Sequence, residues 1–499
     1  MHPFRRNSTT RRKARRWAPR VALGLGVLLW TGCVVGPRYT RPTTVVPPTY
    51  KEGVPAAQAA AQNLQREWWL VFDDPQLDAL EPQISVSNQN LRAAEAQYRQ
   101  ARALVQFNRA GYYPTVTAGA SVAETHLSQN RPPHSATAGA TFTDYLLSAN
   151  LSYEVDAWGR VRSLVEASRA NAQASAADLE TLNLSLQAEL ASDYFQLRSL
   201  DAEKKLLDDN VASFEQALQL TQNRFRGGVA SSVDVAQAQT QLETTRAQDI
   251  DVGVQRAQFE HAIAVLIGKP ASSFSIPLSP LTAPPPAIPP GLPSELLERR
   301  PDIAAAERSL AAINAQIGVT RAAYFPQLAL TAAGGFESGS LGVLLQGPGG
   351  LWSVGASAVQ TAFDAGRRRA SVEGVQASYD QAVAAYRQDI LTAFQDVEDN
   401  LAALRILEDE AKTQDAAVQA AQQFLTQSTT RYRGGVTSYL EVLLAQEVAL
   451  SDERTAVSIL GRRLNASVFL IKALGGGWDA ATGIPQAEAM AVNAGRSGQ

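Results

Sequence analysis

Arg224-Phe-Arg-Gly-Gly-Val-Ala-Ser-Ser-Val-Asp-Val235 recurs in this chain as Arg431-Tyr-Arg-Gly-Gly-Val-Thr-Ser-Tyr-Leu-Glu-Val442, in register over twelve residues. Shorter motifs recur at a similar spacing: Tyr112-Tyr-Pro114 as Tyr324-Phe-Pro326, Asp156-Ala-Trp-Gly-Arg160 as Asp364-Ala-Gly-Arg367, and Asn90-Leu91 with Glu95 as Asp302-Ile303 with Glu307. Similarity at a fixed spacing indicates structural repeats. The sequence therefore predicts a chain that consists of two copies of one unit.

A proline-rich stretch from Pro277 to Pro293 separates the two copies. Proline lacks a backbone donor and interrupts helices, so this stretch is predicted to be an extended linker. We expect a first repeat at 63–276, a second repeat at 294–474 and a flexible tail at 475–499. Each repeat is predicted to contain a helix, two strands, a very long helix and a further helix.

Two long segments, Val161 to Arg226 and Val375 to Arg433, contain neither glycine nor proline. A helix of the first length would extend on the order of 100 Å, far beyond the globular average of about 11 to 12 residues. Apolar side chains recur in it at steps of three and four: Leu179, Leu182, Leu186, Leu190, Tyr194, Leu197 and Leu200. A shorter helical segment follows each long one, interrupted at Gly253 or Gly461. A simple coiled-coil stalk would share these features.

Four runs of alternating apolar and polar residues predict strands. In the clearest run, Ala149, Leu151, Tyr153 and Val155 alternate with Ser148, Asn150, Ser152, Glu154 and Asp156. Two shorter runs follow Pro114 and Pro326, and a less regular one extends from Leu351 to Phe363. Such alternation is typical of a transmembrane β-barrel. Four strands cannot close a barrel, and their open edges would leave backbone N–H and C=O groups without hydrogen-bond partners in lipid. Several copies must therefore share one barrel, and three copies would give twelve strands with room for a passage.

The N-terminus predicts export from the cytoplasm. Eight basic and no acidic residues precede the apolar stretch Val21 to Trp30, which is typical of a secretory signal peptide at 1–32. Cys33 follows directly and is the only cysteine, so no intrachain disulfide can form. This placement resembles the lipobox of bacterial lipoproteins, although Trp30 stands where that motif usually has leucine. We therefore predict an N-terminal extension at 33–62 that carries diacylglycerol and palmitate on Cys33.

Charge and motif content exclude several functions. Removal of the signal peptide would change the formal net charge from −3 to −11, which argues against nucleic acid as a partner. The four histidines are scattered, and His-Glu-x-x-His, Gly-x-Ser-x-Gly and phosphate-binding or dinucleotide-binding glycine motifs do not occur. We expect no enzymatic activity, no metal site and no cofactor other than the lipid.

Taken together, these residues resemble the outer-membrane factors of tripartite efflux pumps, the TolC and OprM type, in the NodT-like lipoprotein branch. The most specific matches are Cys33-Val-Val-Gly-Pro-Arg-Tyr39, Trp68-Trp69 with Phe72, Leu292-Pro-Ser-Glu-Leu-Leu-Glu-Arg-Arg-Pro-Asp-Ile303 and the paired Arg-Gly-Gly turns. The resemblance implies a mainly helical homotrimer with a twelve-stranded transmembrane β-barrel, which a twelve-helix α-barrel continues into the periplasm. It also implies that the shorter helices stack end to end in pairs.

The resemblance implies an exit duct that conducts small molecules, such as drugs or other toxic compounds, across the outer membrane. The implied partners are a periplasmic adaptor (membrane fusion) protein and an inner-membrane pump, with the RND type as one candidate. The implied location is the outer membrane, with a lipid anchor and an extension into the periplasm. Two alternatives stay open: an exit duct for type I protein secretion, and a lipid-anchored periplasmic coiled-coil scaffold without a pore.

The two glycine turns are the first candidate site. Glycine permits the positive φ that ends a helix, and a plain helix cap would explain the residue choice. The resemblance adds that these tips meet helical hairpins of the adaptor. The predicted docking residues are Gly227, Gly228, Val229, Gly434, Gly435 and Val436.

A periplasmic gate is the second candidate site. Phe225 in the first copy corresponds to Tyr432 in the second, which can donate a hydrogen bond. The resemblance implies that Tyr432 bonds Asp234 and helps to hold the inner helix pair closed. Glu441 matches an acidic ring of the family, and three copies would form a narrow, cation-favouring ring. Both acidic residues also lie near helix N-termini, where acids are favoured in any case.

Two positions depart from the pattern of the family near this gate. Thr437 stands where the family has an arginine that assists the latch, so this second latch is predicted to be missing. Leu444 replaces the second acidic ring. The predicted gate therefore has fewer polar contacts than the family pattern.

Overall fold

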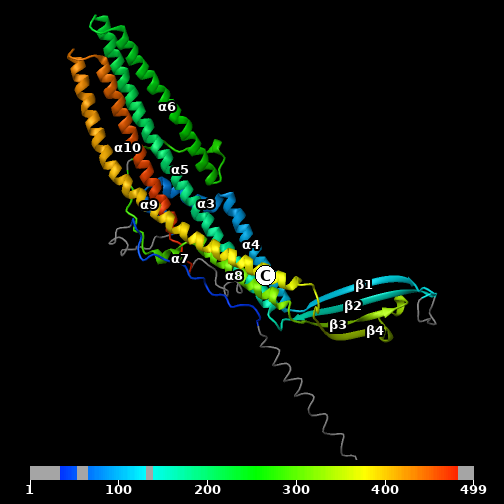
Figure 1. Ribbon diagram of the computed structural model, residues 1–499. Helices are drawn as coiled ribbons and strands as arrows, with labels where there is room; N and C mark the ends of the chain where they lie inside the picture. The colour runs from blue at the N-terminus through cyan, green and yellow to red at the C-terminus, as the bar shows by residue number, and fades with distance from the viewer. Residues whose placement is uncertain (1–33, 53–65, 131–138, 282, 481–499) are drawn as a thin grey trace, which may run out of the picture. The chain divides into compact units, whose positions relative to one another are not determined.

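The computed structural model describes residues 34–52, 66–130, 139–281 and 283–480 (Figure 1). The predicted signal peptide, Cys33 and most of the predicted tail lie outside the described residues. The chain divides into two compact units. We call them the strand unit, which contains residues 1–42, 99–172 and 307–384, and the helix unit, which contains residues 43–98, 173–306 and 385–499.

The first repeat has the predicted order of elements. Its elements are η2 (Trp68–Phe72), α3 (Pro75–Ser87), α4 (Gln89–Arg109), η3 (Ala110–Tyr112), β1 (Thr115–His126), β2 (Thr141–Val155), α5 (Arg160–Arg226), α6 (Ser232–Leu266) and η4 (Ala271–Ser273). The long helix α5 begins one residue before the predicted segment and ends with it. The sequence alone therefore placed this helix correctly.

The second repeat has matching elements. They are η5 (Pro293–Glu295), α7 (Leu296–Arg299), α8 (Pro301–Ala322), β3 (Gln327–Ser338), η6 (Leu341–Val343), η7 (Gly347–Gly349), β4 (Gly350–Val359), α9 (Arg367–Arg433) and α10 (Tyr439–Ala473). Helices α5 and α9 each have 67 residues, and α6 and α10 each have 35. The predicted two-repeat architecture is confirmed. None of the described helices is both long enough and apolar enough to cross a membrane.

Glycine inside the helices is better tolerated than the sequence suggested. Helix α9 begins at Arg367 and continues through Gly374, whereas the prediction began after that glycine. The prediction that Gly253 and Gly461 interrupt the shorter helices was wrong, because α6 and α10 continue through them. One internal glycine costs a helix only about 1 kcal/mol. At Gly461 close packing explains the residue, since a Cβ there would lie 2.9 Å from the Ser199 hydroxyl oxygen.

The same aspartate motif begins both long helices. The carboxylate of Asp156 accepts hydrogen bonds from the backbone amides of Val161 and Arg162 at 2.9 and 3.0 Å. In the second repeat, Asp364 accepts from the amides of Gly366 and Arg368 at 3.2 and 3.3 Å. These bonds satisfy donors that would otherwise lack partners in the first turn of each helix. The repeated aspartate of the sequence is therefore a helix cap.

The shorter helices meet end to end in the helix unit. The side-chain amide of Asn88, just before α4, donates to the carbonyl of Leu266 at the end of α6 at 2.8 Å. In the second repeat, Arg300 Nη1, just before α8, donates to the carbonyl of Ala473 at the end of α10 at 3.2 Å. A polar side chain thus fills the same role at each junction.

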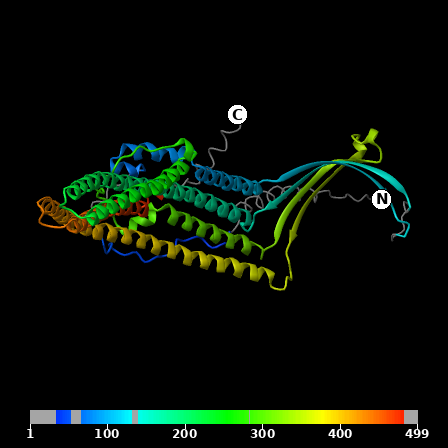
Figure 2. The ribbon, with the colours of Figure 1, turned by 90° about the horizontal axis from the view of Figure 1, so that it is seen from above.

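The four described strands form one antiparallel sheet in the order β1-β2-β3-β4 (Figure 2). Paired residues point to the same side of a sheet, so the register defines two faces. One face is polar and small, with Ser148, Asn150, Ser152 and Glu154 of β2 beside Thr331 and Ala329 of β3. The opposite face is apolar, with Ala149, Leu151, Tyr153 and Val155 beside Ala332, Leu330 and Leu328. Among the described strands, β1 and β4 each have only one neighbour.

Candidate functional site

The turns at the two hairpin tips have the same backbone geometry. Gly228 and Gly435 each have a φ of +74°. The amide of Val229 donates to the carbonyl of Arg224 at 2.8 Å, and the amide of Val436 donates to the carbonyl of Arg431 at 3.0 Å. These bonds satisfy carbonyls at the ends of α5 and α9. The second glycine of each pair is therefore required by the turn itself.

The first glycine of each pair has no such requirement. A Cβ at Gly227 or Gly434 would meet its nearest neighbours at 3.6 and 3.5 Å, which are ordinary contacts, and neither residue has a positive φ. Beside them, Val229 and Val436 are 69% and 71% exposed. Each tip thus presents a small glycine next to an exposed valine, and the fold of the chain does not account for this choice.

The structure gives the predicted gate residues other partners than the resemblance implied. The Tyr432 hydroxyl is buried and donates to the hydroxyl of Thr221 on α5 at 3.4 Å. The Asp234 carboxylate accepts from the backbone amide of Ser231 at 3.0 Å, and the Ser231 hydroxyl accepts from the amide of Asp234 at 3.2 Å. This is a capping box at the start of α6. The predicted bond between Tyr432 and Asp234 is absent from this described region.

A second tyrosine supports Tyr432 from within its own hairpin. The rings of Tyr432 and Tyr439 pack edge to face with centroids 5.5 Å apart. The Tyr439 hydroxyl donates to the Gln446 side-chain oxygen at 3.4 Å. Burial raises the pKa of Tyr439 to about 12, so its hydroxyl stays protonated at neutral pH. Both tyrosines are therefore held by the packing between the helices at the tips.

Arg224 joins the two hairpins, which sequence analysis missed. Its guanidinium carbon lies 4.7 Å from the centroid of the Tyr432 ring. Its Nη1 also donates to the carbonyl of Arg433, at the C-terminus of α9, at 3.2 Å. A cation is favoured both over an aromatic face and at a helix C-terminus. The repeated motif could have drawn attention to Arg224, but the equivalent Arg431 in the second repeat lies near Glu441 instead.

Glu441, at the start of α10, has several polar partners within the chain. Its carboxylate oxygen lies 3.5 Å from Arg431 Nη1, and it accepts a hydrogen bond from the Thr437 hydroxyl. The Ser428 hydroxyl lies 3.4 Å from the same carboxylate. The threonine that replaces the family arginine thus contacts Glu441, and part of the negative charge is balanced within the chain.

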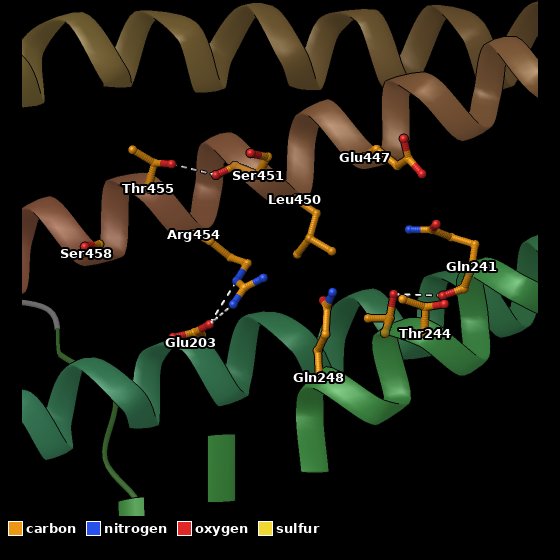
Figure 3. A pocket seen from close by; sticks show the side chains of 11 residues that line it. Glu203, Gln241, Thr244, Gln248, Glu447, Leu450, Ser451, Arg454, Thr455 and Ser458 are labelled. Atoms are coloured by element: carbon orange, nitrogen blue, oxygen red, sulfur yellow. Dashed lines mark hydrogen bonds and ion pairs between the residues drawn. The ribbon is translucent and has the colours of Figure 1, made fainter. Parts of the chain in front are cut away.

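A polar groove of about 620 Å³ lies between α5, α6 and α10 (Figure 3). It is lined by Glu203 of α5, by Gln241, Thr244, Thr245 and Gln248 of α6, and by Glu447, Leu450, Ser451, Arg454, Thr455 and Ser458 of α10. Arg454 Nε lies 2.8 Å from the Glu203 carboxylate, which joins α10 to α5 across the groove.

Both repeats of the chain match one protein family. Residues 81–269 and 292–476 match the family model described as outer membrane efflux protein. These ranges span most of both repeats, and the chain belongs to the outer membrane efflux protein family. It is accordingly an outer-membrane channel protein of the efflux type.

Individual relatives agree over nearly the whole chain. The toluene efflux pump outer membrane protein TtgF of Pseudomonas putida is 33% identical over 92% of this chain and 97% of its own. The cation efflux system protein CusC of Escherichia coli is 30% identical over 90% of this chain and 97% of its own. The solved outer-membrane channel OprN is 33% identical with a TM-score of 0.82, over 89% of this chain and 100% of that chain.

Proposed function

We propose that three copies of this chain form an exit duct that passively conducts small molecules across the outer membrane. The observation that carries this proposal is the sheet, which has one apolar face, one polar face and two unpaired edges among the described strands. Open edges are not tolerated in lipid, so neighbouring copies must pair β1 with β4. Three sheets supply twelve strands, enough for a wall around an aqueous passage.

The cargo is a class of small toxic compounds delivered by an inner-membrane pump through a periplasmic adaptor. One relative is named for toluene and another for cations, so the same architecture serves cargoes of different chemistry. The polar face of β2 offers small uncharged side chains at Ser148, Asn150 and Ser152. Such a wall suits passive conduction.

The proposal is tested by adding purified protein to planar bilayers and recording current. We expect stepwise channel openings from a particle of three chains. Persistent silence, including from a variant whose gate has been weakened, would favour a scaffold without a pore.

We also propose that Cys33 carries an N-terminal lipid. The first described residues lie against the junction of strands and helices in the strand unit. The amide of Val35 donates to the carbonyl of Trp158 at 3.3 Å, and the Trp158 ring stacks on Phe325 with centroids 4.9 Å apart. Aromatic side chains gather where membrane meets water. In the assembled duct Val35 would therefore lie at membrane level, which suits a lipid attached to the nearby Cys33.

Replacement of Cys33 by serine is expected to abolish labelling with radioactive palmitate, because serine lacks the thiol that is acylated. The measurement is incorporation into protein purified from cells. Substitution at Thr31 serves as a control that leaves the thiol in place. A wild-type protein that never incorporates label would contradict the proposed anchor.

We propose that the tips dock helical hairpins of the adaptor. Gly227 and Gly434 are exposed and are not required by the turns, so contact with another backbone supplies a reason for these residues. Exposed Val229 and Val436 add apolar surface beside them. Small residues allow two helices to approach closely, and the adjacent valines provide the buried area.

Substitution of tryptophan for Gly227 and Gly434 is expected to reduce crosslinking to the adaptor at least about tenfold, since bulk at the contact blocks close approach. Trimers should form normally, because neither position has a positive φ. The matched control is alanine at Gly228, which strains the turn by about 1 kcal/mol but adds little bulk. Equal loss in both variants would assign the effect to turn geometry.

We further propose that Arg224, Tyr432 and Thr221 form a latch that holds the hairpins together in the closed channel. Arg224 lies over the Tyr432 ring and bonds the end of α9, and Tyr432 bonds Thr221. These contacts join the α5–α6 hairpin to the α9–α10 hairpin. In this arrangement Asp234 caps α6, and Glu441 faces the passage with part of its charge balanced by Arg431.

A further inference from the structure

Glu154 and Arg160 form an ion pair where the polar face of the sheet meets the helices. Glu154 is the last but one residue of β2 and shares its face with Ser148, Asn150 and Ser152, because side chains alternate along a strand. The register places Ala329 of β3 opposite Glu154 on this face. In a closed barrel the polar face lines the passage, so Glu154 faces inward.

The Glu154 carboxylate is held in a fixed position by two side chains. Arg160 contacts it through Nε and Nη2, each at 2.7 Å from one carboxylate oxygen. Gln327 donates its side-chain amide to the same carboxylate at 3.1 Å. A two-pronged arginine contact of this kind fixes both charge and orientation. The side chains of Glu154 and Arg160 are still 23% and 40% exposed, so solvent and passing solutes reach them.

These residues line a cavity of about 450 Å³ where the strands meet the helices. The polar face beyond it is uncharged over a long distance, from Ser152 to Leu146 along β2 and from Ala329 to Gly335 along β3. The pair therefore supplies charge at this end of the face, where Asp156, which also lines the cavity, is itself paired with Arg162 at 3.0 Å.

The second repeat lacks the carboxylate of this pair. Alignment of Asp156 with Asp364 places Ala362 at the position of Glu154, while the first helical residue is arginine in both repeats. Three copies of the chain would therefore carry three such pairs around the passage. The pair is a specific feature of one repeat and is not a consequence of the repeat pattern.

We infer that Glu154, neutralised by Arg160 and oriented by Gln327, sets the charge selectivity of the passage where strands meet helices. The inference rests on the proposed function as a duct. A paired carboxylate presents a polar wall with little net charge, which admits solutes of either sign. An unpaired partner would expose one charge per chain, and three like charges around one passage favour ions of the opposite sign.

The test measures reversal potentials of single channels in a gradient of potassium chloride. Arg160→Gln should increase the ratio of cation to anion permeability at least about twofold, and Glu154→Gln should decrease it by a similar factor. The double variant should return to the wild-type ratio, since neither charge remains. A charge acts over about 10 Å at 0.1 M salt and about 3 Å at 1 M, so both shifts should fade at high salt.

The matched control is Glu124→Gln, which removes the same charge from the apolar face of the sheet. The register pairs Glu124 with Thr143, on the side opposite to Glu154. Its permeability ratio should equal that of the wild type. Unchanged ratios in Arg160→Gln and Glu154→Gln, in channels of normal conductance, would overturn the inference and leave the duct intact. Channels that never form from the wild-type chain would instead contradict the proposed function.

Discussion

Replacement of Arg198 by methionine is expected to lower the stability of the helix unit by about 3–5 kcal/mol, because it leaves a buried carboxylate with one fewer partner. The side chains of Arg198 and Asp201 are 3% and 0% exposed, and Arg198 Nη1 lies 2.8 Å from the Asp201 carboxylate. A buried charge that loses its partner cannot recover its hydration. Methionine keeps most of the side-chain volume, so the loss reports on charge and hydrogen bonding.

The same arginine holds the linker between the repeats. Arg198 Nη1 donates to the carbonyl of Pro277 at 2.7 Å. Asp201 accepts from the amide of Ser279 at 3.0 Å and pairs with Arg256 Nε at 2.6 Å. The proline-rich segment is thus tied to α5 and α6 by a buried polar network. Loss of Arg198 should release the linker as well as the ion pair.

The matched control is Lys205→Met on the same helix. Lys205 and Asp209 pair at 2.9 Å, but their side chains are 62% and 65% exposed. An exposed pair contributes only about 0–1 kcal/mol. The measurement is the guanidinium midpoint of the helical circular dichroism signal for each variant. Equal midpoints for Arg198→Met and Lys205→Met would show that burial of this network contributes nothing to stability.

The periodic spacing of apolar residues predicted most of the fold. The alternation around Tyr153 predicted a strand, and the apolar stripe through Leu190 and Leu197 predicted a buried helix face, because burial imposes a period of two on strands and of 3.6 on helices. Both patterns are set by many residues at once. Single residues were less reliable guides, since the helices continue through both Gly374, where a Cβ would meet nothing within 4 Å, and Gly461, where Ser199 packs closely.

The partners at the tips could not be predicted from the sequence. Arg224 and Arg431 occupy the same motif position, yet Arg224 reaches the neighbouring hairpin and Arg431 lies near Glu441 of its own hairpin. A sequence repeat predicts the same backbone conformation in both copies, but the side chains of the two copies have different neighbours. Asp234 bonds the amide of Ser231, three residues away in its own helix start, and does not bond Tyr432 in the described region. Which of several possible partners a side chain bonds depends on distances in the folded structure, and the spacing of residues along the sequence does not give these distances.

Replacement of Arg224 by glutamine together with Tyr432 by leucine is expected to increase the fraction of time that the channel is open about thirtyfold while open states remain rare. Loss of a cation–π contact and of a charged hydrogen bond to the Arg433 carbonyl would destabilise the closed state by about 2 kcal/mol. In the intact chain the Arg224 guanidinium lies 4.7 Å from the Tyr432 ring centroid, and its Nη1 lies 3.2 Å from that carbonyl oxygen. Single-channel recording in planar bilayers gives the open probability.

Two further variants separate this latch from a tyrosine–aspartate latch. Tyr432→Phe keeps the ring beneath Arg224 and removes only the 3.4 Å bond to Thr221, so its open probability should rise much less. Asp234→Ala removes the capping box of α6, which costs about 1 kcal/mol of helix stability but no contact between hairpins. A large increase with Asp234→Ala, and none with Arg224→Gln, would contradict the arginine latch and restore the aspartate to that role. The two latches make opposite predictions because Arg224 bonds the neighbouring hairpin, whereas the carboxylate of Asp234 bonds the start of its own helix.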